Sequence, residues 1–326
     1  MADVAVVGAG VMGLATAHAL QRAGCDAVVY EQFEAGHARG SSHGRSRIFR
    51  LAYPEPHWVR LAQEALAGWR RLETESGEQL LELDGLLEIV CDLRHSSVAA
   101  LDACAVPWDQ LSRAEAQRRF PLRLPEGSFG VLQPQAGIVR ADRALAAFAR
   151  GIDVRYGTRI DSLADLGERC IVVTAGAWVN DLVTPPLAVR VTRETVCYFN
   201  LKDARPLPAF VARGPQQGTV FYGLADPLYG LKAAAHHAGP QTDPNEKGVP
   251  DGVLVEAITE WVAQYVDLPD PRLAEAQSCL YTTTADESFV LERRGGIVIG
   301  SACSGHGFKF APAIGARIAT LVREIL

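Results

Sequence analysis

A short apolar run that ends in a glycine-rich turn, close to the first residue, restricts the fold more than any other feature of the sequence. Val4–Val7 is followed by Gly8-Ala9-Gly10-Val11-Met12-Gly13, which matches the pattern GxGxxG, and then by a helix expected over residues 14–23. A second apolar strand, Ala27–Tyr30, follows directly and ends at Glu31. This order of strand, turn, helix and strand predicts the βαβ unit that opens a dinucleotide-binding domain.

Each position of the glycine motif has a physical role in such a domain. The first glycine permits a tight turn, the second lets backbone approach a pyrophosphate, and the third allows close packing of helix on strand. The helix N-terminus offers free N–H groups to the phosphates, and an acidic residue about 20 positions on accepts hydrogen bonds from a ribose. The expected dinucleotide contacts here are Gly8, Gly10, Val11, Met12, Gly13 and Glu31. A turn without ligand is the alternative, and the motif alone does not distinguish NAD from FAD.

Composition narrows the class of protein. The 326 residues are 48% apolar and 21% charged, which is typical of a globular protein large enough for two domains. A net charge of −6 argues against a general nucleic-acid binder. No secretory signal precedes the first strand, and no apolar run reaches the roughly 18 residues of a membrane span. The seven cysteines form no CxxC pair, so we expect no metal centre. Together with the charge and the apolar runs, this predicts a cytoplasmic protein without a nucleic-acid partner or a membrane partner.

The rest of the chain predicts α/β segments interleaved with a second domain. Helices are expected over 58–76, 141–150, 251–266 and from Pro312 onward, and strands over 152–160, 170–174, 191–201, 219–224 and 297–300. The segment after residue 76 is interpreted as polar and rich in loops, and turns between the later strands favour a mostly antiparallel sheet. We expect an α/β (α+β) fold in which residues 1–80, 138–188 and 284–326 form a discontinuous Rossmann-type domain. Residues 81–137 and 189–283 would form the other domain.

A basic segment follows the nucleotide strand. Residues 40–53 contain Ser42, His43, Arg45, Arg47 and Arg50. Arg47 and Arg50 are three positions apart, so on a helix they would share a face. Guanidinium groups suit a carboxylate or an electron-rich ring edge, although a solvated basic face is the alternative.

Two further segments contain candidate functional residues. Residues 302–310, between an apolar strand and the last helix, place His306 between Gly305 and Gly307 and end in Phe308, Lys309 and Phe310. The glycines would let backbone lie flat against a planar ligand, and the following helix N-terminus would favour negative charge on it. Residues 277–289 contain Cys279, which by itself is more simply a buried apolar thiol.

These segments together resemble the monomeric sarcosine oxidase and N-methyltryptophan oxidase family of flavoenzymes. The motifs GAGVMG, SSHGRSRIFR, YGLK, SCLYTTTADESF and SGHGFKF occur in the family's order over nearly the whole chain. The resemblance implies an FAD-binding domain joined to a substrate domain with a large antiparallel sheet. It also implies oxidation of a secondary amine or N-methyl amino acid to an imine, with molecular oxygen reduced to hydrogen peroxide.

The resemblance also assigns roles to residues. Cys279 would bind FAD covalently through its 8α-methyl carbon, and Arg50 and Lys309 would clamp the substrate carboxylate. The implied catalytic residues are Arg47 and Lys232 against the flavin, with Lys232 assisting the reaction with oxygen, His306 beside the amine, and Tyr222 and His236 lining the site. The other implied FAD contacts are Ser42, His43, Arg47, Ile160, Thr174, Gly176, Trp178, Gly305, Gly307, Phe308 and Lys309.

Three alternatives remain open from the sequence. A flavin-dependent amino-acid dehydrogenase would pass electrons to an acceptor other than oxygen, and Lys232 would then be an ordinary edge-strand residue. A flavoprotein could also bind its ligand without turnover, and an NAD-dependent dehydrogenase would leave Cys279 without a role. The loops expected to select the amine side chain, 53–60 and 202–218, differ from the family pattern, so sarcosine itself is not implied.

Overall fold

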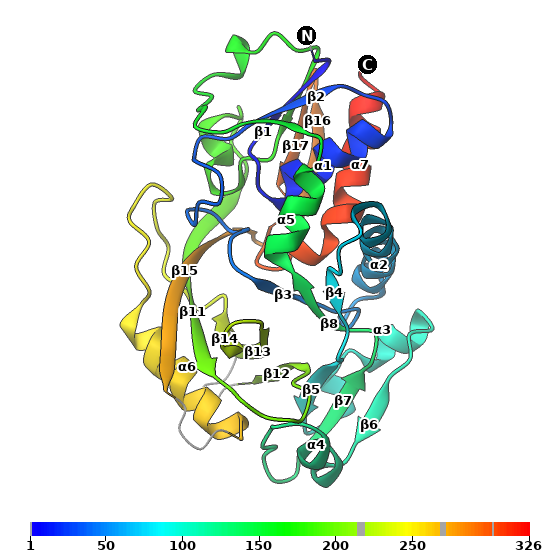
Figure 1. Ribbon diagram of the computed structural model, residues 1–326, viewed down its shortest axis with the longest axis vertical. Helices are drawn as coiled ribbons and strands as arrows, with labels where there is room; N and C mark the ends of the chain where they lie inside the picture. Colours follow the sequence, from blue (N-terminus) through cyan, green and yellow to red (C-terminus); the bar gives the residue numbers. More distant parts are fainter. Residues whose placement is uncertain (1, 214–218, 268–271, 302) are drawn as a thin grey trace.

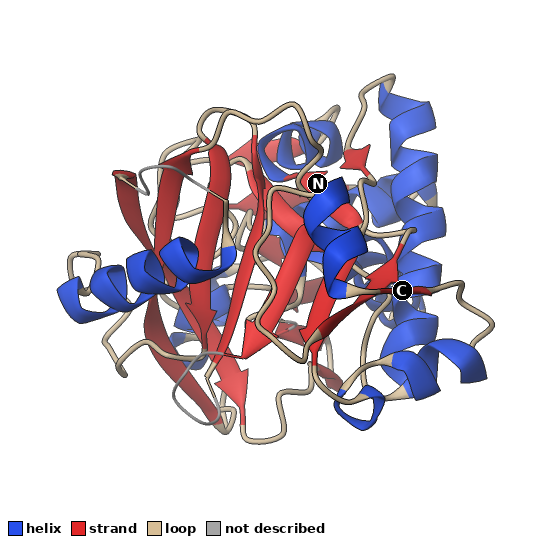
Figure 2. Ribbon diagram, turned by 90° about the horizontal axis from the view of Figure 1, so that it is seen from below, coloured by secondary structure: helices blue, strands red, loops and turns tan. Residues whose placement is uncertain are grey.

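The computed structural model describes residues 2–213, 219–267, 272–301 and 303–326, so the last part of the 202–218 loop lies outside the described residues. Figure 1 shows an elongated molecule with one sheet region at each end and both chain termini at the same end. Figure 2 shows the strands gathered in the interior and helices on the outside. The two sheet regions, at opposite ends of the molecule, are formed by different segments of the chain.

A six-stranded sheet lies at the end that carries the termini. Its strands, in spatial order, are β16 (Val290–Arg294), β17 (Ile297–Ser301), β10 (Cys170–Val173), β1 (Val4–Val7), β2 (Ala27–Tyr30) and β9 (Asp153–Arg155). All neighbours pair in parallel except β16, which is antiparallel to β17. β1 lies inside the sheet with every residue buried, as an uninterrupted apolar run predicts for a parallel strand covered on both faces. The predicted βαβ opening is confirmed.

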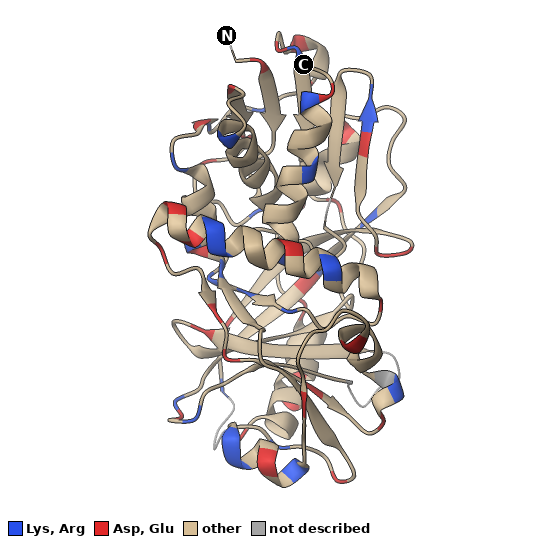
Figure 3. Ribbon diagram, turned by 90° about the vertical axis from the view of Figure 1, so that its right-hand side faces the viewer, with Lys and Arg blue, Asp and Glu red and all other residues tan. Residues whose placement is uncertain are grey.

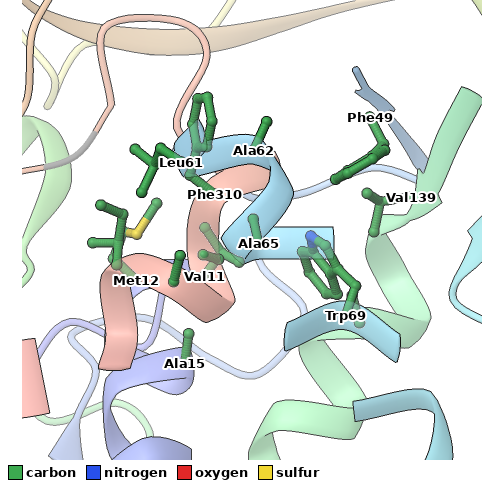
Figure 4. Close-up of a cluster of buried hydrophobic side chains, with 14 of the residues drawn as sticks. Val11, Met12, Ala15, Phe49, Leu61, Ala62, Ala65, Trp69, Val139 and Phe310 are labelled. Atoms are coloured by element: carbon green, nitrogen blue, oxygen red, sulfur yellow. The ribbon is translucent and has the colours of Figure 1, made fainter. Parts of the chain in front are cut away.

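Helices α1 (Val11–Arg22) and α7 (Ala311–Arg323) pack against this sheet, α2 (Pro56–Ser76) packs on α7, and α5 (Ala141–Ala149) packs on α1. Figure 4 shows side chains of α1 and α2 in one buried cluster with Phe49, Val139 and Phe310, which directly precedes α7. Small residues bring these helices close together, since a Cβ on Gly315 would lie 2.6 Å from the carbonyl carbon of Ala15. This packing fixes the N-terminus of α1 relative to the C-terminal segment.

An eight-stranded sheet forms the opposite end. Its order is β15 (Leu273–Thr284), β11 (Val189–Asn200), β14 (Gly230–His236), β13 (Val220–Asp226), β12 (Ala209–Arg213), β5 (Leu86–Val90), β7 (Phe129–Gln133) and β6 (Asp109–Leu111). Only the pair of β12 and β5 is parallel, so the predicted large antiparallel sheet is confirmed. Helix α6 (Gly252–Tyr265) covers its outer face, where Trp261 stacks on Phe210 and Phe221.

The chain also forms a small third sheet and two further α-helices. The sheet consists of β3 (Ser46–Phe49), β8 (Gly137–Arg140) and β4 (Leu81–Glu82) in that order, and the helices are α3 (Val98–Ala103) and α4 (Arg113–Arg119). The suggestion that Arg47 and Arg50 share a helical face is wrong, because Arg47 lies in β3, paired with Val139 of β8. The edge-strand interpretation of Lys232 is also wrong, because β14 lies between β11 and β13.

Other predictions differ from the structure in extent. Helix α1 begins at Val11 rather than at residue 14, because the motif's last glycine is already inside the helix. The strand expected over 152–160 is only Asp153–Arg155, since it pairs at the sheet edge with the short β2. The segment after residue 76 was predicted to be mostly loop, yet it supplies β5, β6 and β7 to the large sheet. Their pairing partners lie far away in sequence, which local patterns do not show.

The strands of the six-stranded sheet come from residues 4–30, 153–173 and 290–301, while the predicted domain boundaries stay a prediction. Figure 3 shows acidic and basic residues interspersed along the helices on one side of the molecule. Within the described residues, no helix combines the length and the apolarity needed to cross a membrane.

Candidate functional site

A cavity of about 610 Å³ extends from the glycine turn after β1 to the strands of the eight-stranded sheet. It is lined by residues from both sheets and from the β3 segment. Every site residue predicted from the sequence lines it except Gly13. The structure therefore brings together segments more than 200 residues apart in the chain.

Gly13 does not line the cavity but lies directly behind the glycine turn, against Gly8. A Cβ there would lie 1.9 Å from the carbonyl oxygen of Gly8, so only glycine lets the helix approach the turn this closely. Gly8 itself has a φ of +104°, in the region that favours glycine, and its added Cβ would meet the Thr174 carbonyl at 2.6 Å. The Thr174 hydroxyl donates to the carbonyl oxygens of Val7 and Gly8, 3.1 Å away in each case. Thr174 thus holds the turn from the neighbouring strand.

The first turn of α1 is open toward the cavity. Its N-cap residue, Gly10, has no side chain to cap the helix, and the Val11 N–H donates to the Ser42 hydroxyl at 3.0 Å. Glu31 is buried at the end of β2 and accepts hydrogen bonds from the backbone N–H groups of Ala9 and Phe33. A helix N-terminus attracts phosphate, and a fixed carboxylate can accept from ribose hydroxyls.

Gly176, Trp178 and Ile160 line the same end of the cavity. Trp178 contacts the ring of Phe33 edge to face, and its indole N–H donates to the Asn245 side chain at 2.9 Å. Trp178 therefore joins the nucleotide end to the loop that follows β14.

Arg47 and Lys232 place two cations in the middle of the cavity. Arg47 donates to the backbone carbonyls of Ser41, His43 and Ser46, and its guanidinium lies 5.4 Å from the ring centre of Phe308. Lys232 is 5% exposed and donates to the Ser46 carbonyl at 3.0 Å. Burial, and then the nearby Arg47 charge, lower the pKa of Lys232 well below its usual value. An anion bound here would be stabilised by both groups.

His43 lies beside these cations. Burial, followed by the charges of Arg47 and Lys232, lowers its pKa to about 4, so its imidazole is neutral near pH 7. Its Nε2 is buried and has no hydrogen-bond partner among the described residues. A buried unpaired polar atom costs free energy unless a ligand satisfies it, and this one lines the cavity.

Cys279 lies in β15 between two cavities. It lines the main one and a second cavity of about 520 Å³, which Arg39, Arg193 and Lys247 also line. Burial raises the pKa of the Cys279 thiol, while Arg47 and Lys232 lower it in part. The thiolate is the nucleophilic form of cysteine, so burial, the larger effect, disfavours that form and the two cations offset part of this effect.

Arg50 and Lys309 lie at the opposite end from the glycine turn, on either side of Tyr53. The Lys309 ammonium donates to the Tyr53 hydroxyl at 2.9 Å and to the His306 carbonyl at 2.7 Å. The Arg50 guanidinium lies 4.5 Å from the centre of the Tyr53 ring. Burial, and then the Arg50 charge, lower the pKa of Lys309 well below its usual value. In the part of the chain that the structure describes, neither cation forms an ion pair with a carboxylate.

Both ring nitrogens of His306 have partners. Nδ1 is 3.1 Å from the Tyr53 hydroxyl and Nε2 is 3.0 Å from the Glu287 carbonyl. Since a carbonyl only accepts, Nε2 carries the proton and Nδ1 accepts from Tyr53. Burial, and then Lys309, lower the pKa of His306 to about 3, which keeps the ring neutral.

Tyr222, His236 and Tyr281 complete this end. The Tyr281 hydroxyl is 3.5 Å from Nδ1 of His236, and burial keeps the pKa of His236 well below its usual value. Gly305, with a φ of +71°, lies so close that a Cβ would be 2.4 Å from the Tyr281 ring. The glycine is required both by its conformation and by the space that Tyr281 occupies.

Sequence reasoning missed three residues that line or support this site: Tyr53, Tyr198 and Tyr281. Tyr281 could have been found, because it stands two positions after Cys279, on the same face of a strand. Tyr53 lies in the loop 53–60 that was expected to select the amine side chain, but nothing in the sequence indicates its contact with Lys309. Tyr198 is placed by the pairing of β11 with β14, for which there is no local signal.

The donor set fits FAD. The glycine turn and open helix end suit its pyrophosphate, Glu31 suits its ribose, and the cations at Arg47 and Lys232 suit an electron-rich ring. The unpaired Nε2 of His43 supplies an orphaned polar atom in the same wall.

Comparison with known proteins gives the same result. A family model described as FAD dependent oxidoreductase matches residues 3–321. The chain is 33% identical to the peroxisomal sarcosine oxidase of Homo sapiens over 96% of this chain and 90% of that protein. It is 26% identical to the N-methyl-L-tryptophan oxidase of Yersinia pestis, over 96% and 92%. The solved structure of NikD, an unusual amino acid oxidase essential for nikkomycin biosynthesis, has a TM-score of 0.87 at 26% identity, covering 99% and 94%.

Proposed function

The chain belongs to the family of FAD-dependent oxidoreductases, and from this premise we propose that it oxidises a secondary amine or N-methyl amino acid to an imine with molecular oxygen as acceptor. The same proposal assigns it to the cytoplasm. Support for the substrate class comes from the similarity to sarcosine and N-methyl-L-tryptophan oxidases and from the charges at one end of the cavity.

The main structural support for an amino-acid substrate is the pair of cationic side chains Arg50 and Lys309. Both line the cavity, and within the described residues neither is paired with a carboxylate. A buried ammonium without a counter-ion is unfavourable, so an amino-acid carboxylate would supply the missing charge. Two fixed cations would also orient the substrate's α-carbon, and orientation of this kind lowers a reaction barrier by several kcal/mol.

FAD, when bound, supplies the acceptor for the two electrons of the amine C–H bond. The amine must be unprotonated for its lone pair to form the C–N double bond, and Arg50 and Lys309 disfavour the protonated form by charge repulsion. The neutral imidazole of His236 can accept a hydrogen bond from the amine N–H. Because His306 already has partners at both nitrogens, we assign it to positioning Tyr53 and Lys309.

A substrate series tests this assignment. Under anaerobic conditions, N-methyl amino acids should bleach the flavin absorbance, and matched amines without a carboxylate should do so far more slowly. The Lys309→Met variant should lose most of this difference, whereas Lys202→Met, at an exposed position, should keep it. Equal rates for both amine classes in the unaltered enzyme would contradict the carboxylate clamp.

The proposal also names molecular oxygen as the electron acceptor. Lys232 is a buried cation beside the expected flavin position, and a cation lowers the cost of forming superoxide from oxygen. Lys232→Met should therefore slow flavin reoxidation by oxygen more than flavin reduction by the amine. Slow reoxidation already in the unaltered enzyme, with fast turnover on an artificial electron acceptor, would favour the dehydrogenase alternative.

We also propose that Cys279 holds FAD covalently, as the resemblance implies. Its position in the cavity wall and the neighbouring cations support this. After acid precipitation the yellow colour should remain with the protein pellet, and in Cys279→Ser it should move to the supernatant. Cys303→Ser is the matched control, because Cys303 lines the same cavity but is outside the motif. Release of the flavin from the unaltered protein would overturn the covalent bond.

A further inference from the structure

A group of three potential metal ligands lies at the substrate end of the cavity and shares one residue, His236, with the machinery described above. His236, His237 and Glu287 each place one ligand atom within 4.8 Å of the other two. His236 lines the cavity, whereas Glu287 is exposed on the turn between β15 and β16. The group therefore spans the distance from the cavity wall to solvent.

The backbone explains how two consecutive histidines come to lie side by side. Adjacent residues of a strand point to opposite faces. Strand β14 ends at His236, and His237 has a φ of +55°, which turns its ring toward that of His236 with 4.1 Å between ring centres. Glu287, which faces His237, also has a positive φ, of +58°. Such conformations are unfavourable for non-glycine residues and are concentrated at functional sites.

The histidine nitrogens are available for a ligand. Nε2 of His237 is buried and has no hydrogen-bond partner among the described residues, and the nearest Glu287 oxygen is 3.7 Å away, too far for a hydrogen bond. Among the described residues, the polar contact of the His236 ring is a long one, from Nδ1 to the Tyr281 hydroxyl at 3.5 Å. The positively charged side chains of Arg50 and Lys309 lie near His236. The Glu287 carboxylate offsets part of the surrounding positive charge.

We propose that His236, His237 and Glu287 form a binding site for a divalent transition metal ion of the zinc type, and that the bound ion hinders access of the amine. Two imidazoles and one carboxylate form a ligand set that zinc uses with a further position open to water. Ligand atoms on one zinc ion lie about 3–3.5 Å apart, so the three atoms, which lie within 4.8 Å of one another, would move closer together on binding, and the exposed Glu287 side chain is free to rotate for this. An ion there would use a nitrogen of His236, which lines the cavity.

The site and the amine chemistry are tested separately. Zn²⁺ is titrated calorimetrically into the FAD-loaded enzyme without amine, which measures binding even if the proposed oxidation is wrong. One ion per chain should bind, and X-ray absorption should show only nitrogen and oxygen ligands. Loss of an outer partner alone reduces metal affinity about 10- to 100-fold, so loss of a ligand should cost at least about 100-fold.

Two variants remove one ligand each. His237→Asn keeps a residue that tolerates positive φ, and Glu287→Gln keeps the shape of its side chain. Both should retain amine oxidation without metal, since neither residue belongs to the proposed catalytic group. His18→Asn is the control, because His18 faces Glu75 at 3.3 Å and the part of the chain that the structure describes adds no third ligand there. In the unaltered enzyme Zn²⁺ should raise the amine KM without changing kcat, and a chelator should reverse this.

Three outcomes would overturn the inference. One is Zn²⁺ binding of equal strength in the unaltered enzyme and in His237→Asn. Another is sulfur in the ligand sphere, which would place the ion at cysteines instead. The third is a Zn²⁺ ion bound at this site that leaves the amine KM unchanged, which would refute the effect on access.

Discussion

The two ends of the cavity hold their expected ligands by different means. At the glycine turn, most of the contacts come from one stretch of about 30 residues, and they are made by backbone, by a helix N-terminus and by one carboxylate. At the substrate end, side chains from β3, β13, β14, β15 and the segment before α7 converge, and most are charged or aromatic. The first end should therefore be sensitive to added volume, and the second to the loss of individual polar groups.

The largest expected effect follows from adding volume behind the glycine turn. In Gly13→Ala the new Cβ would meet the Gly8 carbonyl oxygen at 1.9 Å, and backbone on both sides would have to move. We expect more than about 3 kcal/mol of lost stability and no retained flavin. Flavin absorbance per chain and thermal unfolding measure this. Gly167→Ala is the control, because a Cβ there meets nothing within 4 Å. A normal flavin content in Gly13→Ala would contradict the expectation that the glycine turn is sensitive to added volume.

At the substrate end, removing one charge should reduce catalysis while FAD stays bound. Truncating one partner of a buried charge pair costs about 2–4 kcal/mol, so Lys309→Met should lower kcat/KM for a carboxylate substrate roughly 30- to 900-fold. Steady-state kinetics at matched flavin content measure it. A loss of flavin in this variant would show that the two ends are not independent.

The pH dependence of kcat/KM should also depend on Lys309. Since burial and Arg50 lower the pKa of Lys309, its proton is lost at a lower pH than that of an exposed lysine, and the carboxylate then loses a cation. In the free enzyme kcat/KM should fall about tenfold per pH unit on the alkaline side. Lys309→Arg should move this alkaline fall to higher pH. An alkaline limb that stays in place in Lys309→Arg would assign it to another group.

A smaller effect is expected from the hydroxyl between Lys309 and His306. Tyr53→Phe removes the acceptor of the Lys309 N–H bond and the donor to His306. The loss of about 1–2 kcal/mol should raise the amine KM roughly 5- to 30-fold with little change in kcat. The alkaline fall of kcat/KM should also begin at lower pH, because the ammonium loses a stabilising partner. A purely structural role would leave that pH unchanged.

The smallest effect is expected at Glu31. The N–H groups of Ala9 and Phe33 donate to different oxygens of Glu31, so Glu31→Gln, which keeps one acceptor oxygen, keeps one of these two bonds and loses the other. FAD affinity of the apoprotein should fall roughly 2- to 13-fold, which corresponds to the loss of one hydrogen bond at about 0.5–1.5 kcal/mol. Fluorescence titration measures it. A complete loss of binding would mean that this end depends on single side chains as much as the other does.

Much of the nucleotide end could be predicted from the sequence. The apolar run of β1, the spacing of Gly8, Gly10 and Gly13, and Glu31 after the next strand are local signals with one physical interpretation. The motif segments also indicated which charged residues would meet, because their order resembles that of one family. The first kind of prediction depends on a short stretch of chain in which neighbours in sequence are neighbours in space, and the second depends on the resemblance.

What the sequence determined by itself is the dinucleotide turn and the set of residues available for chemistry. Only the tertiary structure decided that Lys232 lies in an interior strand, that Tyr53 joins Lys309 to His306, and that β5 and β7 complete the large sheet. It also decided that His236 and His237 lie side by side near Glu287. These arrangements depend on strand pairing and on single backbone conformations between distant segments, and the hydrophobic pattern of one strand does not name its partner.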